Sequence, residues 1–199
     1  MYAKRERILL INGHPGETNL SRQLLDRYFE AATTAGKEVR RHNLAEMQFD
    51  VDFGQSDYQR SKPLEPVLQA LIDDLVWSQH VVLASPLWWG GLPAKLKGLF
   101  DRILLPGHAF DPRNRNILGA PAPLLKGRTA RLILTADTAR WELRWFYGDG
   151  ILKQLRRQVF AFVGIRPMHL SYFGPVEDAD GARIQGWERE MERLGSVAG

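Results

Sequence analysis

The chain has 199 residues, a length that fits one globular domain. Hydrophobic residues make up 44% and charged residues 25% of it, which excludes a disordered or fibrous protein. It contains no cysteine, which excludes disulfides, thiolate metal sites and a cysteine nucleophile, and fits a reducing cytoplasm. We therefore expect a single domain over residues 1–199 of a cytoplasmic protein.

Neither of two apolar runs suggests export or insertion into a membrane. The first, at residues 8–11, is shorter than the apolar region of a secretion signal. The second, at residues 81–94, is too short to span a bilayer and is interrupted by prolines and glycines. We expect a soluble protein with no membrane insertion.

The net charge of +4 is unevenly distributed along the chain. Residues 95–157 carry thirteen Lys and Arg against five Asp and Glu, so this stretch is strongly basic and the remainder is acidic. Such a distribution fits either a surface for a polyanion or phosphorylated small molecule, or a solvated basic face. Because no helix-turn-helix, zinc or RNA-recognition pattern accompanies it, we expect no nucleic-acid partner.

Short apolar runs alternate with amphipathic helical stretches along the chain. The pattern predicts strands at residues 8–11, 38–44, 81–84, 131–135 and 166–172. It predicts helices from about residue 20 to Gly36, and at residues 64–76, 94–104, 150–162 and 179–194, with a long loop before residue 61. This alternation indicates an α/β protein with a parallel sheet covered by helices on both faces. Ligands of such sheets bind beyond the carboxyl ends of the strands.

The loop after the first strand reads Asn-Gly-His-Pro-Gly-Glu-Thr-Asn-Leu-Ser, residues 12–21. It leads into a helix, so its backbone N–H groups and the helix dipole can hold an anion. It matches neither the dinucleotide-binding nor the P-loop glycine pattern. The alternative is that Thr18 or Asn19 only caps the helix.

The loop after the third strand reads Ser-Pro-Leu-Trp-Trp-Gly-Gly-Leu-Pro, residues 85–93. Two adjacent tryptophans cannot both point into the core, so a large flat ligand is one explanation and a packed or dimer-facing aromatic patch is the other. Gly90 and Gly91 allow the backbone to approach a ring edge. A phosphate-binding loop and an aromatic platform at one sheet edge together describe a flavin nucleotide site.

Residues 8–21 and the segment Ser-Pro-Leu-Trp-Trp-Gly-Gly-Leu-Pro-Ala-Lys-Leu-Lys-Gly-Leu-Phe-Asp-Arg at 85–102 resemble the NAD(P)H:quinone oxidoreductase family. The segments at 107–110 and 182–185 extend this similarity over most of the chain. The resemblance implies a flavodoxin-like three-layer sandwich, with a five-stranded parallel sheet in the order 2-1-3-4-5. It also implies a flavin-bearing homodimer that takes hydride from NAD(P)H as co-substrate and passes two electrons to a quinone or similar small acceptor. Because both reactants would occupy one pocket in turn, we expect a ping-pong mechanism.

The resemblance assigns residues to three parts of the flavin. His14, Thr18, Asn19, Leu20 and Ser21 would hold the phosphate, Pro86, Leu87, Trp88, Trp89 and Gly90 would line the isoalloxazine, and Thr135, Ala136 and Asp137 would meet its pyrimidine side. Arg183 matches an arginine that lies by the distal nucleotide in FAD-binding members, so FAD is expected, with FMN as the other possibility. The alternative for Arg183 is a solvated surface arginine.

The sequence departs from the family pattern after the fourth strand. The family's Thr-Thr-Gly-Gly is replaced by Thr135-Ala136-Asp137-Thr138. A carboxylate near flavin N1 would oppose the charge that reduction places there and lower the potential, unless Asp137 points away. Tyr147 falls about where the family has a histidine, so we expect it to be the catalytic donor to the acceptor oxygen. Trp141, Trp145 and Phe146 either narrow the acceptor pocket or take part in ordinary packing.

The remaining histidines, His42, His80, His108 and His169, lack metal-ligand spacing, so no metal is expected. Two other functions remain open. One is a flavin-binding ancillary subunit of a potassium efflux system with little turnover, suggested by the altered Asp137 loop. The other is a flavin-free structural or nucleic-acid-binding protein that uses the basic half.

Overall fold

A five-stranded parallel sheet forms the centre of the protein in a computed structural model that describes residues 6–54 and 62–197. Its strands are β1 (Arg7–Asn12), β2 (Glu38–Asn43), β3 (His80–Pro86), β6 (Arg128–Thr135) and β7 (Ile165–Phe173). They lie in the order β2-β1-β3-β6-β7. Counted within the sheet, this is the predicted order 2-1-3-4-5, and the flavodoxin-like fold class is confirmed.

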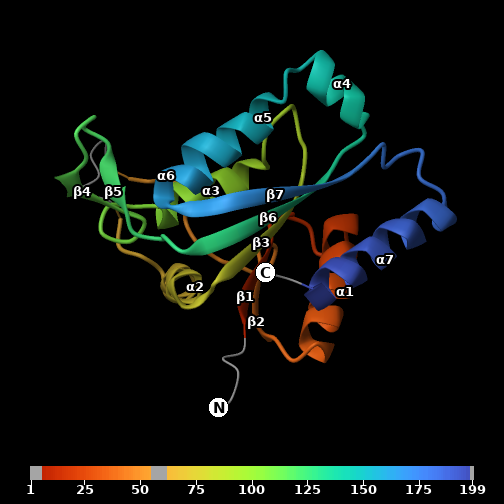
Figure 1. The fold of residues 1–199 in the computed structure, drawn as a ribbon, viewed down its shortest axis with the longest axis horizontal. Helices are drawn as coiled ribbons and strands as arrows, with labels where there is room; N and C mark the ends of the chain where they lie inside the picture. Colours follow the sequence, from red (N-terminus) through yellow and green to blue (C-terminus); the bar gives the residue numbers. More distant parts are fainter. Residues whose placement is uncertain (1–5, 55–61, 198–199) are drawn as a thin grey trace.

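Helices cover both faces of the sheet (Figure 1). One face is covered by α1 (Leu20–Thr34) and α7 (Gly181–Val197). The other is covered by α2 (Pro66–Trp77), α3 (Ala94–Ile103) and a helical run of α5 (Gly150–Lys153), η2 (Gln154–Phe160) and α6 (Ala161–Val163). The predicted helix at 150–162 is thus present, but its middle segment, η2, is π-helical.

Three elements were not predicted from the sequence. They are the hairpin of β4 (Phe110–Arg115) and β5 (Pro121–Pro123), and the short helix α4 (Arg140–Trp145). The hairpin strands carry charged residues and prolines in place of an alternating apolar pattern, so they give little strand signal. Part of the predicted long loop, residues 55–61, lies outside the described residues.

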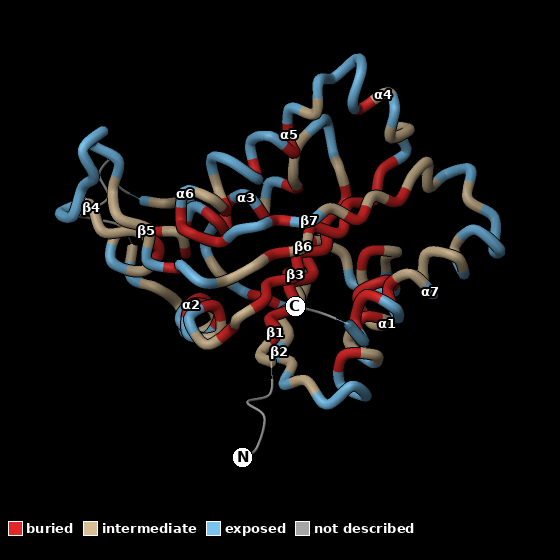
Figure 2. Tube along the Cα trace, in the orientation of Figure 1, coloured by how far each residue is buried: buried red, intermediate tan, exposed pale blue. Residues whose placement is uncertain are grey.

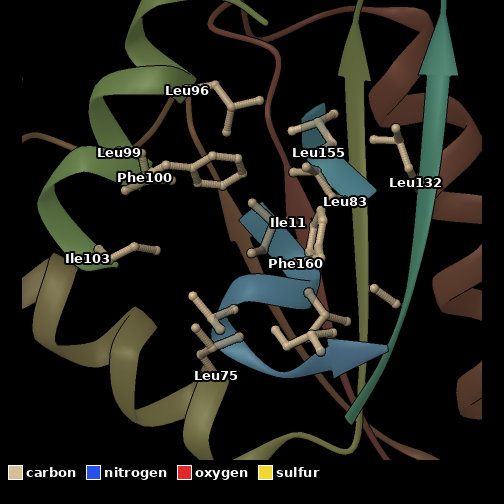
Figure 3. Close-up of a cluster of buried hydrophobic side chains, with 14 of the residues drawn as sticks. Ile11, Leu75, Leu83, Leu96, Leu99, Phe100, Ile103, Leu132, Leu155 and Phe160 are labelled. Atoms are coloured by element: carbon tan, nitrogen blue, oxygen red, sulfur yellow. The ribbon is translucent and has the colours of Figure 1, made fainter. Parts of the chain in front are cut away.

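Apolar side chains from the sheet and the covering helices form the core, and burial is greatest along the central strands (Figure 2). Figure 3 shows the cluster on one face, where Leu83 and Leu132 of the sheet lie opposite Leu96 and Leu99 of α3 and Leu155 of η2. Each fully buried leucine contributes about 1.5–3 kcal/mol to folding. The packed sheet therefore holds the ends of the loops at its carboxyl edge in fixed positions.

Candidate functional site

Three loops meet at the carboxyl edge of the sheet, after β1, β3 and β6. The amide of Gly13 donates to the carbonyl of Ala84 at 2.7 Å, which joins the first loop to β3. The amide of Leu87 donates to the carbonyl of Thr135 at 2.8 Å, which joins the second loop to β6. The buried hydroxyls of Ser21 and Thr135 are 3.1 Å apart and join the start of α1 to the same point. The fold therefore brings the three predicted flavin-binding segments together.

Side-chain hydrogen bonds fix the shape of the first loop. The amide of Gly16 donates to Nδ1 of His14 at 2.9 Å, and Asn19 Nδ2 donates to the carbonyl of Gly16 at 2.7 Å. Asn19 Oδ1 accepts the amide of Arg22 at 2.8 Å, so Asn19 is the N-cap of α1. The capping interpretation is thus correct for Asn19, and it accounts for only one of the amides at this helix start.

Other amides of the first loop have no partner among the described residues. The N–H groups of Thr18, Leu20 and Ser21 donate to no described acceptor, although they lie at the positive end of the α1 dipole. Burial lowers the pKa of His14, and the N–H of Gly16 donated to Nδ1 also favours the neutral ring. Because Nδ1 accepts a hydrogen bond, Nε2 carries the proton and can donate. This set of donors fits a phosphate.

Gly13 allows the first loop to lie close to both β3 and α3. A Cβ atom at this position would be 2.5 Å from Cδ2 of Leu96 and 3.0 Å from the carbonyl oxygen of Ala84. Any larger residue would have to push the Leu96 side chain aside and would crowd the Ala84 carbonyl. The glycine thus sets the depth at which a ligand at this loop approaches the sheet.

The second loop contains a tight turn that holds the two tryptophans outside the core. Trp88 and Gly91 exchange backbone hydrogen bonds of 2.9 and 2.8 Å, and the backbone has positive φ at Trp89 (51°) and Gly90 (72°). Trp89 is fully exposed, and Trp88 is 45% exposed with its ring edge-on to His14 at 5.5 Å between centroids. Trp88 therefore joins the second loop to the first, and its exposed indole can contact a flat ligand.

The third loop is joined to the loop that follows β7. The amide of Ala136 donates to the carbonyl of Phe173 at 3.0 Å, and the Asp137 carboxylate accepts the amide of Glu177 at 2.9 Å. The Asp137 carboxylate is therefore engaged by the β7–α7 loop. Arg183 contacts this loop as well, because its guanidinium donates to the carbonyl of Gly174 at 2.8 Å and lies over the Trp187 ring.

The aromatic residues around α4 are exposed in this chain. The exposed fractions are 56% for Trp141, 73% for Trp145, 75% for Phe146 and 68% for Tyr147. None of these side chains lies in the core, although Trp141 and Phe146 pack edge-to-face with ring centroids 5.7 Å apart. They lie on a projection of the chain that is largely exposed (Figure 2). An ion pair between Arg140 and Asp149, with N–O distances of 2.7 and 3.0 Å, closes its base.

A groove of about 880 Å³ begins beside the second loop, and it was not predicted from the sequence. Gly91 and Leu92 line one end of it, and α3 and the α5–η2–α6 run form its walls. Its lining is mainly apolar and includes Val51, Phe100, Phe110, Ile151, Val159 and Phe162. Phe110 and Phe162 meet edge-to-face, with ring centroids 5.3 Å apart. Because these residues come from separate elements, no single periodic pattern marks the groove.

Ion pairs within the protein engage some of the basic residues in the stretch 95–157. Arg102 is buried against Glu65, and Lys97 and Arg140 form ion pairs with Asp101 and Asp149. Lys153, Arg156 and Arg157 are exposed, and no ion pair is found for them within the described ranges 6–54 and 62–197. The same part of the chain contains no helix that is both long and apolar enough to cross a membrane.

Comparison with known proteins identifies the family. Residues 6–194 match the family described as having a flavodoxin-like fold, so the chain belongs to this family. It is 27% identical to an uncharacterized NAD(P)H oxidoreductase of Haemophilus influenzae, over 86% of this chain and 85% of the relative. It is 35% identical to an FMN-dependent NADH:quinone oxidoreductase of Beijerinckia indica, over 48% of this chain and 45% of that relative.

A solved structure supports the same fold. The NAD(P)H:quinone oxidoreductase of Methanothermobacter marburgensis superposes with a TM-score of 0.79, covering 97% of this chain and 96% of that chain. At 20% sequence identity, this likeness bears on the fold alone.

Proposed function

We propose that this protein is a flavin-dependent NAD(P)H oxidoreductase that transfers two electrons to quinone-like acceptors. The observation that carries the proposal is the meeting of three loops at one sheet edge, where unpartnered amides lie beside an exposed indole. The first loop supplies the N–H donors that suit a phosphate, and the second loop supplies the aromatic surface. Relatives named as NAD(P)H and NADH:quinone oxidoreductases indicate the same reaction.

We propose FMN as the flavin, in place of the FAD expected from the sequence. The expectation of FAD rested on Arg183, whose guanidinium is held by the Gly174 carbonyl and the Trp187 ring. The relative from Beijerinckia indica is named as FMN-dependent. A mononucleotide needs only the phosphate site at the first loop.

Each loop has its own part in holding the flavin. His14, Thr18, Asn19, Leu20 and Ser21 would hold the phosphate, and Asn19 would do so mainly by capping α1. Residues 86–90 would support the ring system, and the backbone of Thr135, Ala136 and Asp137 would meet its pyrimidine side.

The flavin, when bound, supplies the capacity to accept and return a hydride. The chain orients the reactants and excludes water from between them. We propose that both substrates use the same surface beside Trp88, so that oxidised NAD(P)⁺ must leave before the acceptor enters, which gives ping-pong kinetics. Tyr147 follows α4, and its phenol donates a hydrogen bond or proton to the acceptor oxygen. Trp141, Trp145 and Phe146 narrow the entrance for the acceptor.

We further propose that the protein is a homodimer in which a second copy covers the apolar groove. The groove is continuous with the second loop through Gly91 and Leu92. Phe162 is 40% exposed and Val51 is 49% exposed, so dimer formation would bury apolar surface next to the site. A cytoplasmic location stays a prediction.

The ancillary-subunit alternative no longer has a specific observation in its favour. It was suggested by the altered Asp137 loop, and the Asp137 carboxylate accepts a hydrogen bond from the backbone amide of Glu177. The flavin-free alternative rested on the basic half, several of whose residues form structural ion pairs.

The test is to purify the protein, identify any released flavin, and measure initial rates with NADH or NADPH and a simple quinone. We expect FMN at one per chain and parallel double-reciprocal lines. Tyr147→Phe should lower kcat with little change in flavin content, because only the donated proton is removed. A protein that takes up neither FMN nor FAD would refute the proposed function, and intersecting lines would refute the shared surface.

A further inference from the structure

We propose that Asp137 is a positioning residue that fastens the β6–α4 loop to the β7–α7 loop, and that its charge does not set the reduction potential of the flavin. The inference rests on the proposed function.

The two loops are joined over a short stretch by backbone bonds and by Asp137. The amide of Ala136 donates to the carbonyl of Phe173, and the amide of Val176 donates back to the carbonyl of Ala136, both at 3.0 Å. The Asp137 carboxylate extends this pairing by accepting the amide of Glu177 at 2.9 Å. Beyond it, the Tyr172 hydroxyl donates to the carbonyl of Thr138 at 2.5 Å. Asp137 and Tyr172 make these contacts with their side chains, so either can be changed without altering the backbone pairing.

The glycine at position 174 shows how closely the two loops approach. A Cβ atom there would be 2.4 Å from the carbonyl oxygen of Ala136 and 3.1 Å from that of Thr138. Both contacts are with backbone, which cannot move aside as a flexible side chain can. On the other side, the Gly174 carbonyl accepts a hydrogen bond from Arg183. The β6–α4 loop is thus held between its own strand and the β7–α7 loop.

This contact explains how a carboxylate can be tolerated beside the predicted flavin site. The Asp137 carboxylate lies toward Glu177, and the amides of Asp137 and Thr138 donate to no described acceptor. The backbone of the loop can therefore present donors to a ligand, while one oxygen of the Asp137 carboxylate is bonded to a different N–H group, that of Glu177. A carboxylate directed at the flavin would instead oppose the negative charge gained on reduction.

Three variants separate fastening from electrostatic tuning. Asp137→Asn removes the charge and keeps an oxygen acceptor, Asp137→Ala removes both, and Asp178→Asn neutralises a neighbouring exposed carboxylate as the charge control. The measurements are hydrogen exchange of the Glu177 amide in flavin-free protein, the Kd for FMN, and the reduction potential of the loaded protein.

We expect Asp137→Ala to speed exchange at Glu177 and to weaken FMN binding, each about three- to tenfold, because one hydrogen bond is lost. Asp137→Asn should stay within about twofold of the wild type in exchange and Kd. It should also shift the reduction potential of the bound flavin by less than about 9 mV, which is a twofold change in the ratio of reduced to oxidised flavin for a two-electron couple. Asp178→Asn should match the wild type in all three measurements.

Two results would overturn the inference. The first is a rise of about 30 mV in the reduction potential with Asp137→Asn but not with Asp178→Asn, which is a tenfold change in favour of reduced flavin. Such a rise would mean that the charge of Asp137 acts on the flavin. The second is an Asp137→Ala protein with unchanged exchange at Glu177. Failure of the wild type to bind flavin would refute the proposed function, and the exchange measurement would still decide whether Asp137 fastens the loops.

Discussion

Replacing Arg102 with methionine should cost this protein more stability than replacing any exposed cation. Arg102 lies near the end of α3 with a fully buried side chain. Its guanidinium donates to the carbonyls of Asp50 and Pro63 and forms a 2.8 Å ion pair with Glu65. Methionine fills similar space but donates no hydrogen bond, so it leaves two carbonyls and one carboxylate without their partner.

The magnitude follows from burial. Removing one member of a buried ion pair costs about 3–5 kcal/mol. The Glu65 side chain is 30% exposed, so water can reach its carboxylate, and we expect a loss near the lower end, about 3 kcal/mol. The same loss should loosen the segment that carries Val51, which lines the groove and packs against Gly98.

Urea unfolding followed by circular dichroism measures this loss. Lys97→Met is the matched control, because Lys97 lies on the same helix in an exposed ion pair with Asp101 and should change stability by less than about 1 kcal/mol. An Arg102→Met protein that unfolds within 1 kcal/mol of the Lys97→Met protein would refute the reasoning.

The pH dependence gives a second check of the same site. The amide of Asp50, assisted by Arg102, lowers the pKa of Glu65. A depressed carboxyl pKa stabilises the folded state fully above the ordinary value of this group, and the contribution is lost as pH falls through the folded value. The difference in the free energy of unfolding between the wild type and Arg102→Met should therefore become smaller as the pH falls through the folded-state pKa of Glu65.

Three further predictions concern other parts of the molecule. Burial, reinforced by Arg131, lowers the pKa of His80 to about 4. The free energy of unfolding should therefore fall by about 3 kcal/mol as the pH drops from about 6.5 to 4. His80→Leu should remove this pH dependence in urea titrations. Ser21→Ala leaves the Thr135 hydroxyl unpaired and should lower the free energy of unfolding by about 1–2 kcal/mol. The double variant Ser21→Ala/Thr135→Val should recover part of this loss. If the losses of the two single variants simply added up in the double variant, the prediction would be contradicted. Trp145→Ser should leave the free energy of unfolding within about 0.5 kcal/mol but raise the quinone KM several-fold, and an unchanged KM would remove Trp145 from the acceptor entrance.

The strand order was expected from the family resemblance. The sequence by itself determined the parallel sheet and the loops at its carboxyl edge. These follow from local patterns, because buried strands read as continuous apolar runs and covering helices as amphipathic stretches. The loop at 12–21 and the Trp88-Trp89 pair were found in the same way. The resemblance then assigned a ligand to them.

Only the tertiary structure decided what depends on contacts between distant segments. The direction of the Asp137 carboxylate is set by an amide forty residues away in the chain, at Glu177. The apolar groove arises where α3 and the α5–η2–α6 run meet, and the exposure of Trp145 depends on how α4 projects from the body. Periodicity reports which residues share a face of one element, but the position of one element against another is fixed only when their surfaces pack.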